Sequence, residues 1–470
     1  MTAWVRTAVC IALVAAALTP AARAAAAAGC THRVTSDFNG DGRADLAVGE
    51  PYRTVAGAAD AGAVRIIYGS ATGLSRTHEL FDQATPGIVG APTAGDEFGL
   101  ALATGFFNGD CYADLAIGTP GEDDATILYG SASGLSTAGD ERLHGRARVD
   151  GFGYALAAGD LNDDGIDDLV ASAPYAGDGA GEITTMFGGA TGLSTPVKWI
   201  SQGTPGVPGL NEPGDLFGLS LATGDFNGDG HTDVAIGVPF EDDGSATDAG
   251  SVTVLRGSST GPTTTGAQLF TGVSAADHYG YSLAAGDVTG DGRDDLVVGV
   301  PGADDDRGQA VFLTGSAAGL TGSRVLSQDT TGVPGSAEVG DELGVSVAVG
   351  DFTGDGHADV ALGVPGEDLG KAANAGTVDV LPGTSGGPSG VGSRAWSQNT
   401  AGVGGEAETG DEFGSTLYAI GGGLAIAAQL ENAGVGAVTM LPAGLTSKGS
   451  QTIGEPGIAH AGDEFGASLG

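Results

Sequence analysis

The stretch that decides the fold runs from Phe217 to Pro239 and reads FGLSLATGDFNGDGHTDVAIGVP. The same phrase returns from Tyr279 to Pro301 and from Leu343 to Pro365. Weaker versions begin at Phe98, Phe152 and Phe413, a version without its opening starts at Asp37, and an opening alone, Gly462 to Gly470, ends the chain. Self-similarity of this kind is the signature of a repeat architecture. One repeat, of about sixty residues, therefore governs the chain.

Each repeat opens with a short head, in which an Asp stands two residues before an aromatic residue or Leu and a Gly. Seven such heads exist, marked by Asp96, Asp150, Asp215, Asp277, Asp341, Asp411 and Asp463. Seven bodies also exist when the degenerate unit from Leu417 to Leu441 is included. The first body lacks a head and the last head lacks a body. We therefore predict a closed ring in which the C-terminal strand completes the first unit, which removes exposed sheet edges.

Each unit contains four short stretches rich in β-forming residues, separated by Gly, Pro, Asn and Asp. In the unit that opens at Phe217 we expect strands at 217–224, 233–238, 250–256 and 267–271. Four strands per unit indicate a propeller blade; a β-helix is the alternative, but its repeat is much shorter. The predicted fold is an all-β, seven-bladed β-propeller over residues 31–470. Its repeats lie near 31–95, 96–149, 150–214, 215–276, 277–340, 341–410 and 411–470.

An Asp-rich loop separates the first two strands of most units. In the first unit it runs from Asp37 to Asp45, with side-chain oxygens at positions 1, 3, 5 and 9, a backbone carbonyl at 7 and Gly at 6. This spacing wraps oxygen ligands around a hard cation, and Ca²⁺ suits it better than Mg²⁺, which prefers water and a rigid octahedron. We predict about five Ca²⁺ sites, with these ligands: Asp37, Asn39, Asp41, Arg43 and Asp45; Asp160, Asn162, Asp164, Ile166 and Asp168; Asp225, Asn227, Asp229, His231 and Asp233; Asp287, Thr289, Asp291, Arg293 and Asp295; Asp351, Thr353, Asp355, His357 and Asp359.

Two units depart from this pattern. In the second, Phe106 replaces the first Asp and Cys111 replaces the Gly, so we expect no tight site there. In the seventh, the glycines at 421–423 supply no ligands.

The charge balance limits the possible partners. The formal net charge is −41, and the chain has only three lysines, Lys198, Lys371 and Lys448. Nucleic acids require a basic surface, and anionic membranes also favour one, so we expect neither as a ligand. The acidity fits solubility through self-repulsion, carboxylates that hold cations, or both.

The first residues form a separate segment. Arg6 precedes an apolar run from Ala8 to Leu18, and Ala22-Arg23-Ala24 supplies small residues for cleavage. This pattern predicts a secretory signal peptide over residues 1–28, and the apolar run is too short for a membrane span. We therefore expect a secreted protein, with retention at the cell surface left open.

The number of cysteines in the mature chain follows from that cleavage. Cys10 leaves with the signal peptide, so Cys30 and Cys111 remain as a single pair in an exported chain, which predicts one disulfide. Two alternatives are that Cys30, which follows Ala28-Gly29, carries a lipid, or that both thiols are free.

The heads and tails of the units carry a family signature. Heads such as Phe217-Gly218 and tails such as Gly237-Val238-Pro239 or Ser172-Ala173-Pro174 resemble FG-GAP repeats. The chain from about residue 31 onward is similar to the seven-bladed propeller of integrin α subunits and its secreted bacterial relatives. The resemblance implies that the loops bind Ca²⁺ structurally, on the face opposite the ligand-binding face. It implies binding or adhesion by analogy only.

The face opposite the Asp-rich loops collects the long linkers between units. Linkers of thirteen residues lead from Gln83, Gln202, Gln328 and Gln398 to the next head Asp, and one of twelve leads from Gln451. Long loops on one rigid face form a usual recognition surface. The candidate ligand-face residues follow the tail prolines: Tyr52, Arg53, Tyr175 and Phe240. Their rings suit carbohydrate stacking or a partner's cation; alternatively they cover the edge of the next blade.

The sequence lacks familiar catalytic motifs: it contains no G-x-S-x-G, H-E-x-x-H or Walker loop. Some FG-GAP proteins carry a catalytic domain before the propeller, whereas here we expect the repeats to follow the signal peptide directly. We therefore predict a monomeric binding or adhesion module for an extracellular protein or glycan, and no enzyme. The alternatives are a secreted hydrolase that uses paired carboxylates on the propeller face, and a purely structural envelope protein.

Overall fold

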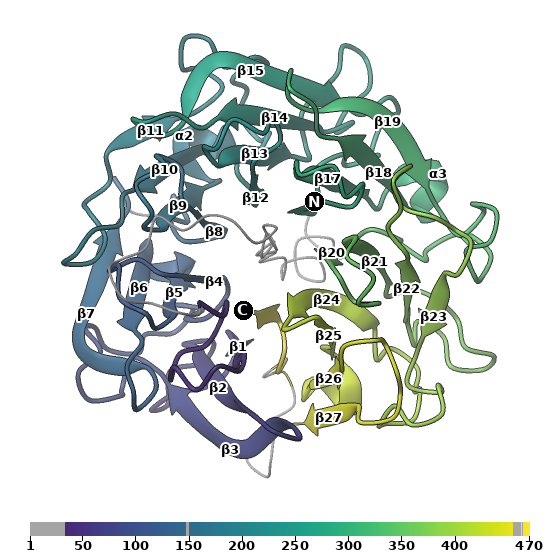
Figure 1. Ribbon diagram of the computed structural model, residues 1–470, viewed down its shortest axis with the longest axis horizontal. Coiled ribbons are helices and arrows are strands. Elements are labelled where there is room, and N and C mark those ends of the chain that lie inside the picture. The colour runs from purple at the N-terminus through teal and green to yellow at the C-terminus, as the bar shows by residue number, and fades with distance from the viewer. Residues whose placement is uncertain (1–32, 147–149, 455–461, 463) are drawn as a thin grey trace.

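The computed structural model describes residues 33–146, 150–454, 462 and 464–470. Seven antiparallel sheets of four strands surround a central axis like the blades of a propeller (Figure 1). The predicted all-β, seven-bladed architecture is confirmed, and the degenerate seventh unit forms a blade like the others.

The blades follow the chain, and the strands of each blade run in order from the axis outward. Blade 1 contains β28 (Ser468–Leu469), β1 (Leu46–Glu50), β2 (Ala63–Ser70) and β3 (Gly73–Phe81). Blade 2 contains β4 (Leu102–Gly105), β5 (Asp114–Thr119), β6 (Asp124–Tyr129) and β7 (Ser136–His144). Blade 3 contains β8 (Leu156–Gly159), β9 (Asp168–Ala173), β10 (Glu182–Met186) and β11 (Lys198–Ile200). Blade 4 contains β12 (Ser220–Gly224), β13 (Asp233–Val238), β14 (Ser251–Arg256) and β15 (Thr263–Thr271).

The remaining three blades have the same order of strands. Blade 5 contains β16 (Leu283–Gly286), β17 (Asp295–Val300), β18 (Gln309–Thr314) and β19 (Thr321–Leu326). Blade 6 contains β20 (Val347–Gly350), β21 (Asp359–Val364), β22 (Thr377–Leu381) and β23 (Arg394–Trp396). Blade 7 contains β24 (Phe413–Ile420), β25 (Gly423–Ala428), β26 (Ala437–Leu441) and β27 (Gln451–Gly454).

The two ends of the chain close the ring. Strand β28 pairs with β1, with Leu469 opposite Val48. The last residue, Gly470, exchanges two backbone hydrogen bonds with Ala47, of 2.8 and 2.9 Å. This pairing confirms the predicted split blade, and it covers the inner edge of blade 1, which would otherwise be open for association.

Burial explains the composition of the strands. Every residue of β12 and β13 is buried, because the two inner strands lie between neighbouring blades, and they are accordingly rich in small and apolar residues. The outer strand β15 contains only half-buried and exposed residues. The inner strand was predicted to start at Phe217 but starts at Ser220, because the head forms a turn in which Gly218 has φ +92°. A Cβ on Gly218 would lie 2.9 Å from the Cβ of Ser172 in the preceding blade, so this turn requires Gly.

A repeated hydrogen bond joins four of the blades to the blade that follows. Ser220, Ser282 and Ser346 each donate their hydroxyl to the carbonyl of the next head Gly, at 2.7, 2.7 and 2.6 Å. Ser468 makes the same bond to Gly99, at 2.6 Å, across the point of ring closure.

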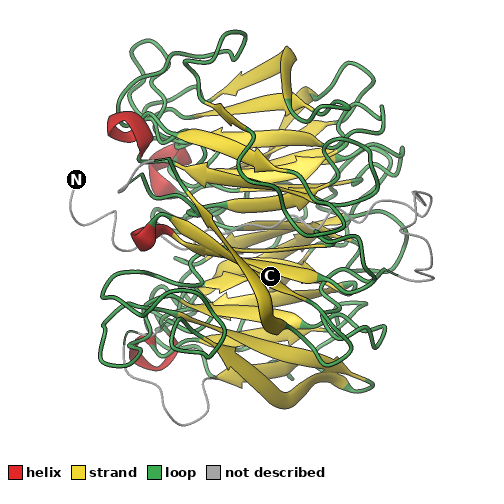
Figure 2. Cartoon of the chain, turned by 90° about the vertical axis from the view of Figure 1, so that its left-hand side faces the viewer, coloured by secondary structure: helices red, strands yellow, loops and turns green. Residues whose placement is uncertain are grey.

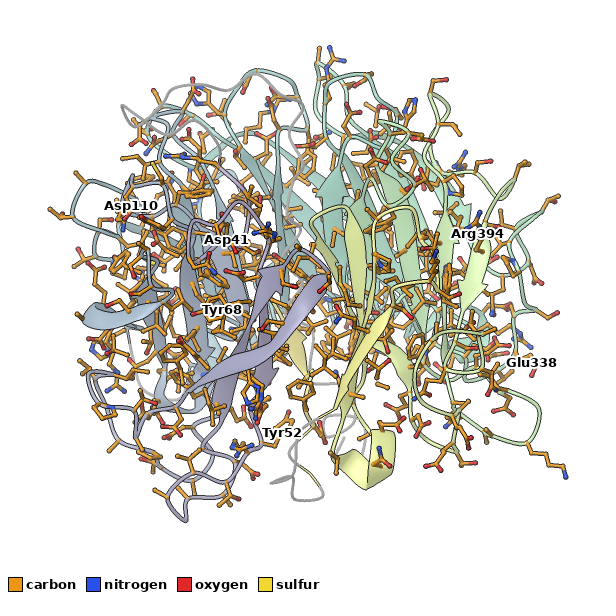
Figure 3. The ribbon with its side chains drawn as sticks, turned by 60° about the horizontal axis from the view of Figure 1, so that its bottom comes forward. Asp41, Tyr52, Tyr68, Asp110, Glu338 and Arg394 are labelled. Carbon is orange, nitrogen blue, oxygen red and sulfur yellow. The ribbon has the colours of Figure 1, made fainter. Side chains whose placement is uncertain are left out.

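The two faces of the disc differ in their connections. The links between second and third strands carry short helical turns: η1 (Pro120–Glu122), α2 (Ala176–Gly179), α3 (Ala303–Asp306) and α4 (Glu431–Gly434). These turns all lie on one side of the disc, which we call the helix face (Figure 2). Asp41 and Asp110, in the links between first and second strands, lie on the opposite side from Tyr52, and we call that side the Asp-loop face (Figure 3). Within the described part of the chain, no helix has the length and apolar character needed to cross a bilayer.

Candidate metal loops and ligand face

The first Asp of each complete loop organises the backbone that follows it. The Oδ1 atom of Asp37 accepts hydrogen bonds from the N–H groups of Gly40, at 2.7 Å, and Asp41, at 3.1 Å, while its Oδ2 accepts one from Gly42, at 2.8 Å. The same three bonds recur at Asp225 and at Asp351. The repeated Asp therefore shapes the turn through its own carboxylate.

Positions 3 and 5 continue this pattern toward solvent. Asn39 accepts a hydrogen bond from the N–H of Asp41, at 2.9 Å, and Asp41 accepts one from Arg43, at 3.0 Å. The guanidinium of Arg43 also lies 3.2 Å from the Asp41 carboxylate, and Arg293 lies 3.1 Å from Asp291 in the fifth unit. Two of the five predicted loops thus place a basic side chain beside the position-5 carboxylate.

The Asp at position 9 is buried and has a second role. Asp45 is fully buried, and it accepts hydrogen bonds from the N–H of Phe38, at 2.9 Å, and from that of Gly69, at 2.7 Å. Because Gly69 belongs to β2, this carboxylate ties the loop to the neighbouring hairpin. Burial raises the pKa of Asp45 to about 7, and the charges of Asp37 and Asp41 contribute to this rise.

The structure brings the predicted ligands near one another without assembling a finished metal site. Burial, with repulsion from the acids at positions 1 and 5 of the same loop, raises the pKa of Asp168 to about 8, of Asp233 to about 7 and of Asp295 to about 6. Among the described residues, no group of three His, Cys, Asp or Glu side chains is placed to hold an ion as it stands. The donors are the hard oxygens that Ca²⁺ prefers, so they fit the ion in kind.

The degenerate loop of blade 2 has the same frame without the first Asp. Asp110 accepts a hydrogen bond from Tyr112, at 2.9 Å, and Asp114 binds the N–H groups of Phe107 and Gly130, at 2.8 and 2.9 Å. In place of a carboxylate, the ring of Phe106 packs under the guanidinium of Arg33, 4.7 Å from the ring centre.

Cysteine placement bears on the same loop. Cys111 is disulfide-bonded rather than a free thiol. The predicted partner, Cys30, lies outside the described residues, so the pairing of these two cysteines stays a prediction.

Comparison with protein families finds the FG-GAP repeat at residues 34–67, 152–186, 217–255, 279–313 and 343–381. These matches fall on the five units with a complete Asp-rich loop. The chain carries FG-GAP repeats. The second and seventh blades, which lack the full loop, lie outside these matched residues.

The relatives extend the likeness to integrin α subunits. The chain is 38% identical over 166 residues to integrin alpha-7 of Rattus norvegicus, a match that covers 33% of this chain and 13% of that protein. It is 32% identical over 224 residues to integrin alpha-5 of Xenopus laevis, covering 44% and 20%. It is 36% identical over 157 residues to phosphatidylinositol-glycan-specific phospholipase D of Rattus norvegicus, covering 32% and 18%. Each match therefore spans about a fifth or less of the relative.

On the helix face of the FG-GAP propeller, three of the four predicted ligand-face residues present aromatic rings. Tyr52 and Phe240 are half-buried and pack on one apolar cluster with Tyr154 of blade 3. Tyr175 is 39% exposed and meets Tyr154 edge-on, with 5.7 Å between ring centres. Phe240 lies 5.1 Å from the ring of His278. These aromatic residues thus both cover blade edges and present ring surface.

The fourth candidate, Arg53, has a structural role. Its guanidinium lies 2.7 Å from the carboxylate of Glu50, a residue that is completely buried. Arg65, also buried, lies 2.8 Å from the other oxygen of the same carboxylate. Arg53 therefore belongs to an ion network inside blade 1, and its contact with a ligand stays a prediction.

Sequence reasoning missed the residue between the head Asp and the aromatic position. This residue has positive φ in all seven heads, between +49° and +71°. In six heads its N–H donates to a carbonyl in the preceding blade, as Glu97 does to Asp60 at 2.9 Å. In blade order from blade 1, the seven residues are Glu464, Glu97, Gly151, Leu216, His278, Glu342 and Glu412. The signal was present in the sequence, since this varying position stands between two repeated ones.

Each of these seven residues shortly precedes the innermost strand of its blade, and we call the set the axial mouth. Its acids occupy the consecutive blades 6, 7, 1 and 2, and blades 3 to 5 carry none. Burial raises the pKa of Glu97, Glu342, Glu412 and Glu464 each to about 7. Repulsion adds to this effect, since the charges of Glu342 and Glu464 both raise the pKa of Glu412. The mouth is therefore acidic on one side; on its other side Gly151 lies against Tyr175, and His278 packs against Phe240.

Proposed function

We propose that this FG-GAP propeller is an extracellular binding module that takes a basic side chain of a protein partner at its axial mouth. The observation that supports it most is the division of the mouth into an acidic arc and an aromatic arc. A cation attached to an apolar stem satisfies both halves, because carboxylates attract the charge and ring faces favour cations and alkyl chains.

The electrostatics of the acidic arc favour such a ligand. No basic group is among the causes that shift the pKa of its four glutamates. These half-buried carboxylates repel one another, and a bound ammonium or guanidinium relieves that repulsion. The chain's net charge of −41 also draws a basic partner toward the surface and speeds association at low salt.

We propose binding rather than catalysis for this site. Acid–base catalysis by a pair of carboxylates needs environments that push their pKa values apart. The four glutamates of the mouth occupy equivalent positions, and the pKa of each is raised to about the same value. Assays with a panel of glycan, ester and phosphodiester substrates test whether the mouth is catalytic. Hydrolysis by the wild type that is lost in Glu97→Gln would contradict a purely binding role.

We further propose that the five complete loops hold Ca²⁺ as part of the scaffold. The residues that would hold it are the side chains at positions 1, 3, 5 and 9, with the carbonyl at position 7. Bound Ca²⁺ would supply positive charge to carboxylates that otherwise raise one another's pKa. The extracellular relatives and the predicted signal peptide support an exported protein, a setting in which millimolar Ca²⁺ sites are filled.

The mouth is tested with fluorescent peptides that differ only in an Arg, Lys or Gln at one position, measured by anisotropy. We expect the Arg and Lys peptides to bind and Glu97→Gln with Glu412→Gln to weaken binding about tenfold, or about 1.4 kcal/mol. Glu406→Gln, which removes the same charge from an exposed linker residue, is the control and should leave affinity unchanged. Equal affinity for the Gln peptide, or binding to a glycan array that survives the double substitution, would overturn the cationic site.

A further inference from the structure

Four of the long linkers begin with a Gln that reaches into the next blade. The Nε2 atom of Gln83 donates to Glu122 at 2.7 Å, and that of Gln328 donates to Glu367 at 2.6 Å. Gln202 and Glu241, and Gln398 and Glu431, form the same pair. These pairs join blades 1 and 2, 5 and 6, 3 and 4, and 6 and 7. Each of these four Gln residues therefore links its blade to the following one by a hydrogen bond.

The other half of each amide has no partner. The Oε1 atoms of Gln83, Gln202, Gln328 and Gln398 make no hydrogen bond, although only 4–5% of each residue is exposed. The linker itself confines the amide, since a Cβ on Gly209 would lie 2.5 Å from the Nε2 of Gln202. A buried acceptor without a donor is costly, so each of these oxygens is free to bind a cation where the neighbouring carboxylates favour one.

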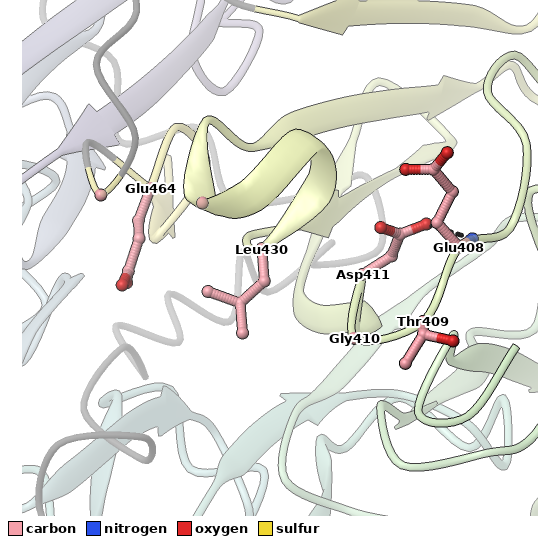
Figure 4. Close-up of a pocket in the computed structure, with 8 residues that line it drawn as sticks. Glu408, Thr409, Gly410, Asp411, Leu430 and Glu464 are labelled. Carbon is pink, nitrogen blue, oxygen red and sulfur yellow. Dashed lines mark hydrogen bonds between the residues drawn. The ribbon is translucent and has the colours of Figure 1, made fainter.

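A second carboxylate completes each cluster. At the junction of blades 6 and 7, Asp411 is 2% exposed and Glu431 8% exposed, and the two carboxyl groups are hydrogen-bonded to each other. Asp411 is oriented by the N–H of Glu408, at 2.6 Å, and Asp411 and Glu408 line a cavity of about 550 Å³ (Figure 4). A cation between two such buried carboxylates would offset their repulsion.

The junction of blades 1 and 2 shows what such a cluster accepts. There the guanidinium of Arg142 forms ion pairs with both Glu122 and Asp124, and its charge also acts on the head residue Asp96. At the junction of blades 5 and 6, Arg307 acts on Asp341. No basic group acts on Asp215, Glu241 or Glu431 among the causes of their raised pKa.

We propose that the junctions of blades 3 and 4 and of blades 6 and 7 each bind a hard divalent cation, Ca²⁺ or Mg²⁺. The ligands are the Gln Oε1, the Glu and the head Asp: Gln202, Glu241 and Asp215 in one site, and Gln398, Glu431 and Asp411 in the other. Amide and carboxylate oxygens are the donors these ions prefer. The sites lie on the helix face, away from the Asp-loops, and they join blades rather than shaping a loop.

The number of bound ions tests this directly. The mature chain is dialysed against Ca²⁺ and its metal content is measured by mass spectrometry, where five loops and two junctions give seven ions. Glu431→Gln and Glu241→Gln should each lose one ion. Glu122→Gln, at the junction that already holds Arg142, should lose none. Unchanged content in both Glu431→Gln and Glu241→Gln would overturn the junction sites.

A second substitution supplies the cation from the protein itself. Thr452 occupies the position in β27 that Arg142 occupies in β7, since their partners across the sheet are Thr439 and Thr126. Thr452→Arg should therefore remove one ion and raise the melting temperature in EDTA. Glu431→Gln should also melt no lower than the wild type in EDTA, because it removes a buried repulsion; a lower melting temperature would speak against the site.

The outcomes separate these sites from the Asp-loops. Asp225→Ala should lose one ion through its loop alone. A wild type with five ions, unchanged in Glu431→Gln, keeps the loops and rejects the junctions. If the wild type binds two ions and the double variant Glu241→Gln with Glu431→Gln binds none, the junction sites are kept and the loop sites are rejected.

Discussion

The loops of blades 1 and 2 have almost the same frame and differ at their first residue. Asp45 and Asp114 are both fully buried, and each accepts two backbone hydrogen bonds, of 2.7 and 2.9 Å and of 2.8 and 2.9 Å. Asp37, which begins the first loop, is replaced in the second by Phe106, whose ring packs under Arg33. Position 9 therefore has the same structural role in both loops, and the two loops differ at position 1.

Removal of calcium should produce the largest difference between the two kinds of loop. Each of the five loops contributes about 2.7 kcal/mol to the free energy of unfolding when free Ca²⁺ is a hundredfold above the Kd of that loop. We therefore expect EDTA to lower the melting temperature strongly in calorimetry, with full recovery on adding Ca²⁺. If chelation leaves melting unchanged, the loops of blade 1 and blade 2 are equivalent and calcium is not part of the scaffold.

Asp114→Ala should have the next largest effect, and it should be independent of calcium. The substitution leaves two buried N–H groups, of Phe107 and Gly130, without an acceptor, at about 1–3 kcal/mol each. The loss of stability should be the same in Ca²⁺ and in EDTA, measured by urea unfolding. Asp110→Ala, whose residue is only half-buried, is the matched control; a calcium-dependent loss in Asp114→Ala would give this loop an ion after all.

Asp37→Asn is expected to separate two roles of Asp37: accepting backbone hydrogen bonds in the loop and supplying charge to Ca²⁺. The amide oxygen can still accept a loop hydrogen bond, but the charge needed for Ca²⁺ is lost. We expect one fewer bound ion and a stability loss of about 1–3 kcal/mol in Ca²⁺, shrinking to less than about 1 kcal/mol in EDTA. An equal loss in both conditions would mean that position 1 acts only on the backbone.

The pH dependence is the smallest expected effect. Burial raises the pKa of Asp45 to about 7 and of Asp114 to about 8, against an ordinary value of 3.8. Between about pH 4 and pH 8 the folded, metal-free chain therefore holds more protons than the unfolded chain. The stability that these protons supply is present below about pH 4 and is lost as the pH rises through 7 to 8. We expect the melting temperature of the metal-free chain to be higher at pH 5 than at pH 8, measured by calorimetry, where about 1 kcal/mol shifts it by about 2–4 °C. With Ca²⁺ bound, acidification should lower it, because the ligands must be ionised; the same sign in both conditions would contradict calcium in the loops.

Much of the fold could be read from repeated residues. The seven heads and bodies predicted seven blades, and their mismatch at the two ends predicted the pairing of β28 with β1. The complete loops coincide with the five FG-GAP matches. Strand limits were less accurate, since the head at Phe217 turns before the strand begins. The ion pair of Arg53 was missed, because its partner Glu50 is a buried acid at a position where most blades carry an apolar residue.

What the sequence determined by itself was the period, the turn residues and the loop spacing, which depend on neighbours along the chain, and, through the mismatched first and last units, the ring closure. Only the tertiary structure decided which residues from different blades meet. The acids of the axial mouth stand one per blade, and the Gln398 and Glu431 of a junction are 33 residues apart. The acids of the mouth act on one another because the ring brings equivalent positions of different blades together and partly buries them, which weakens the screening by water.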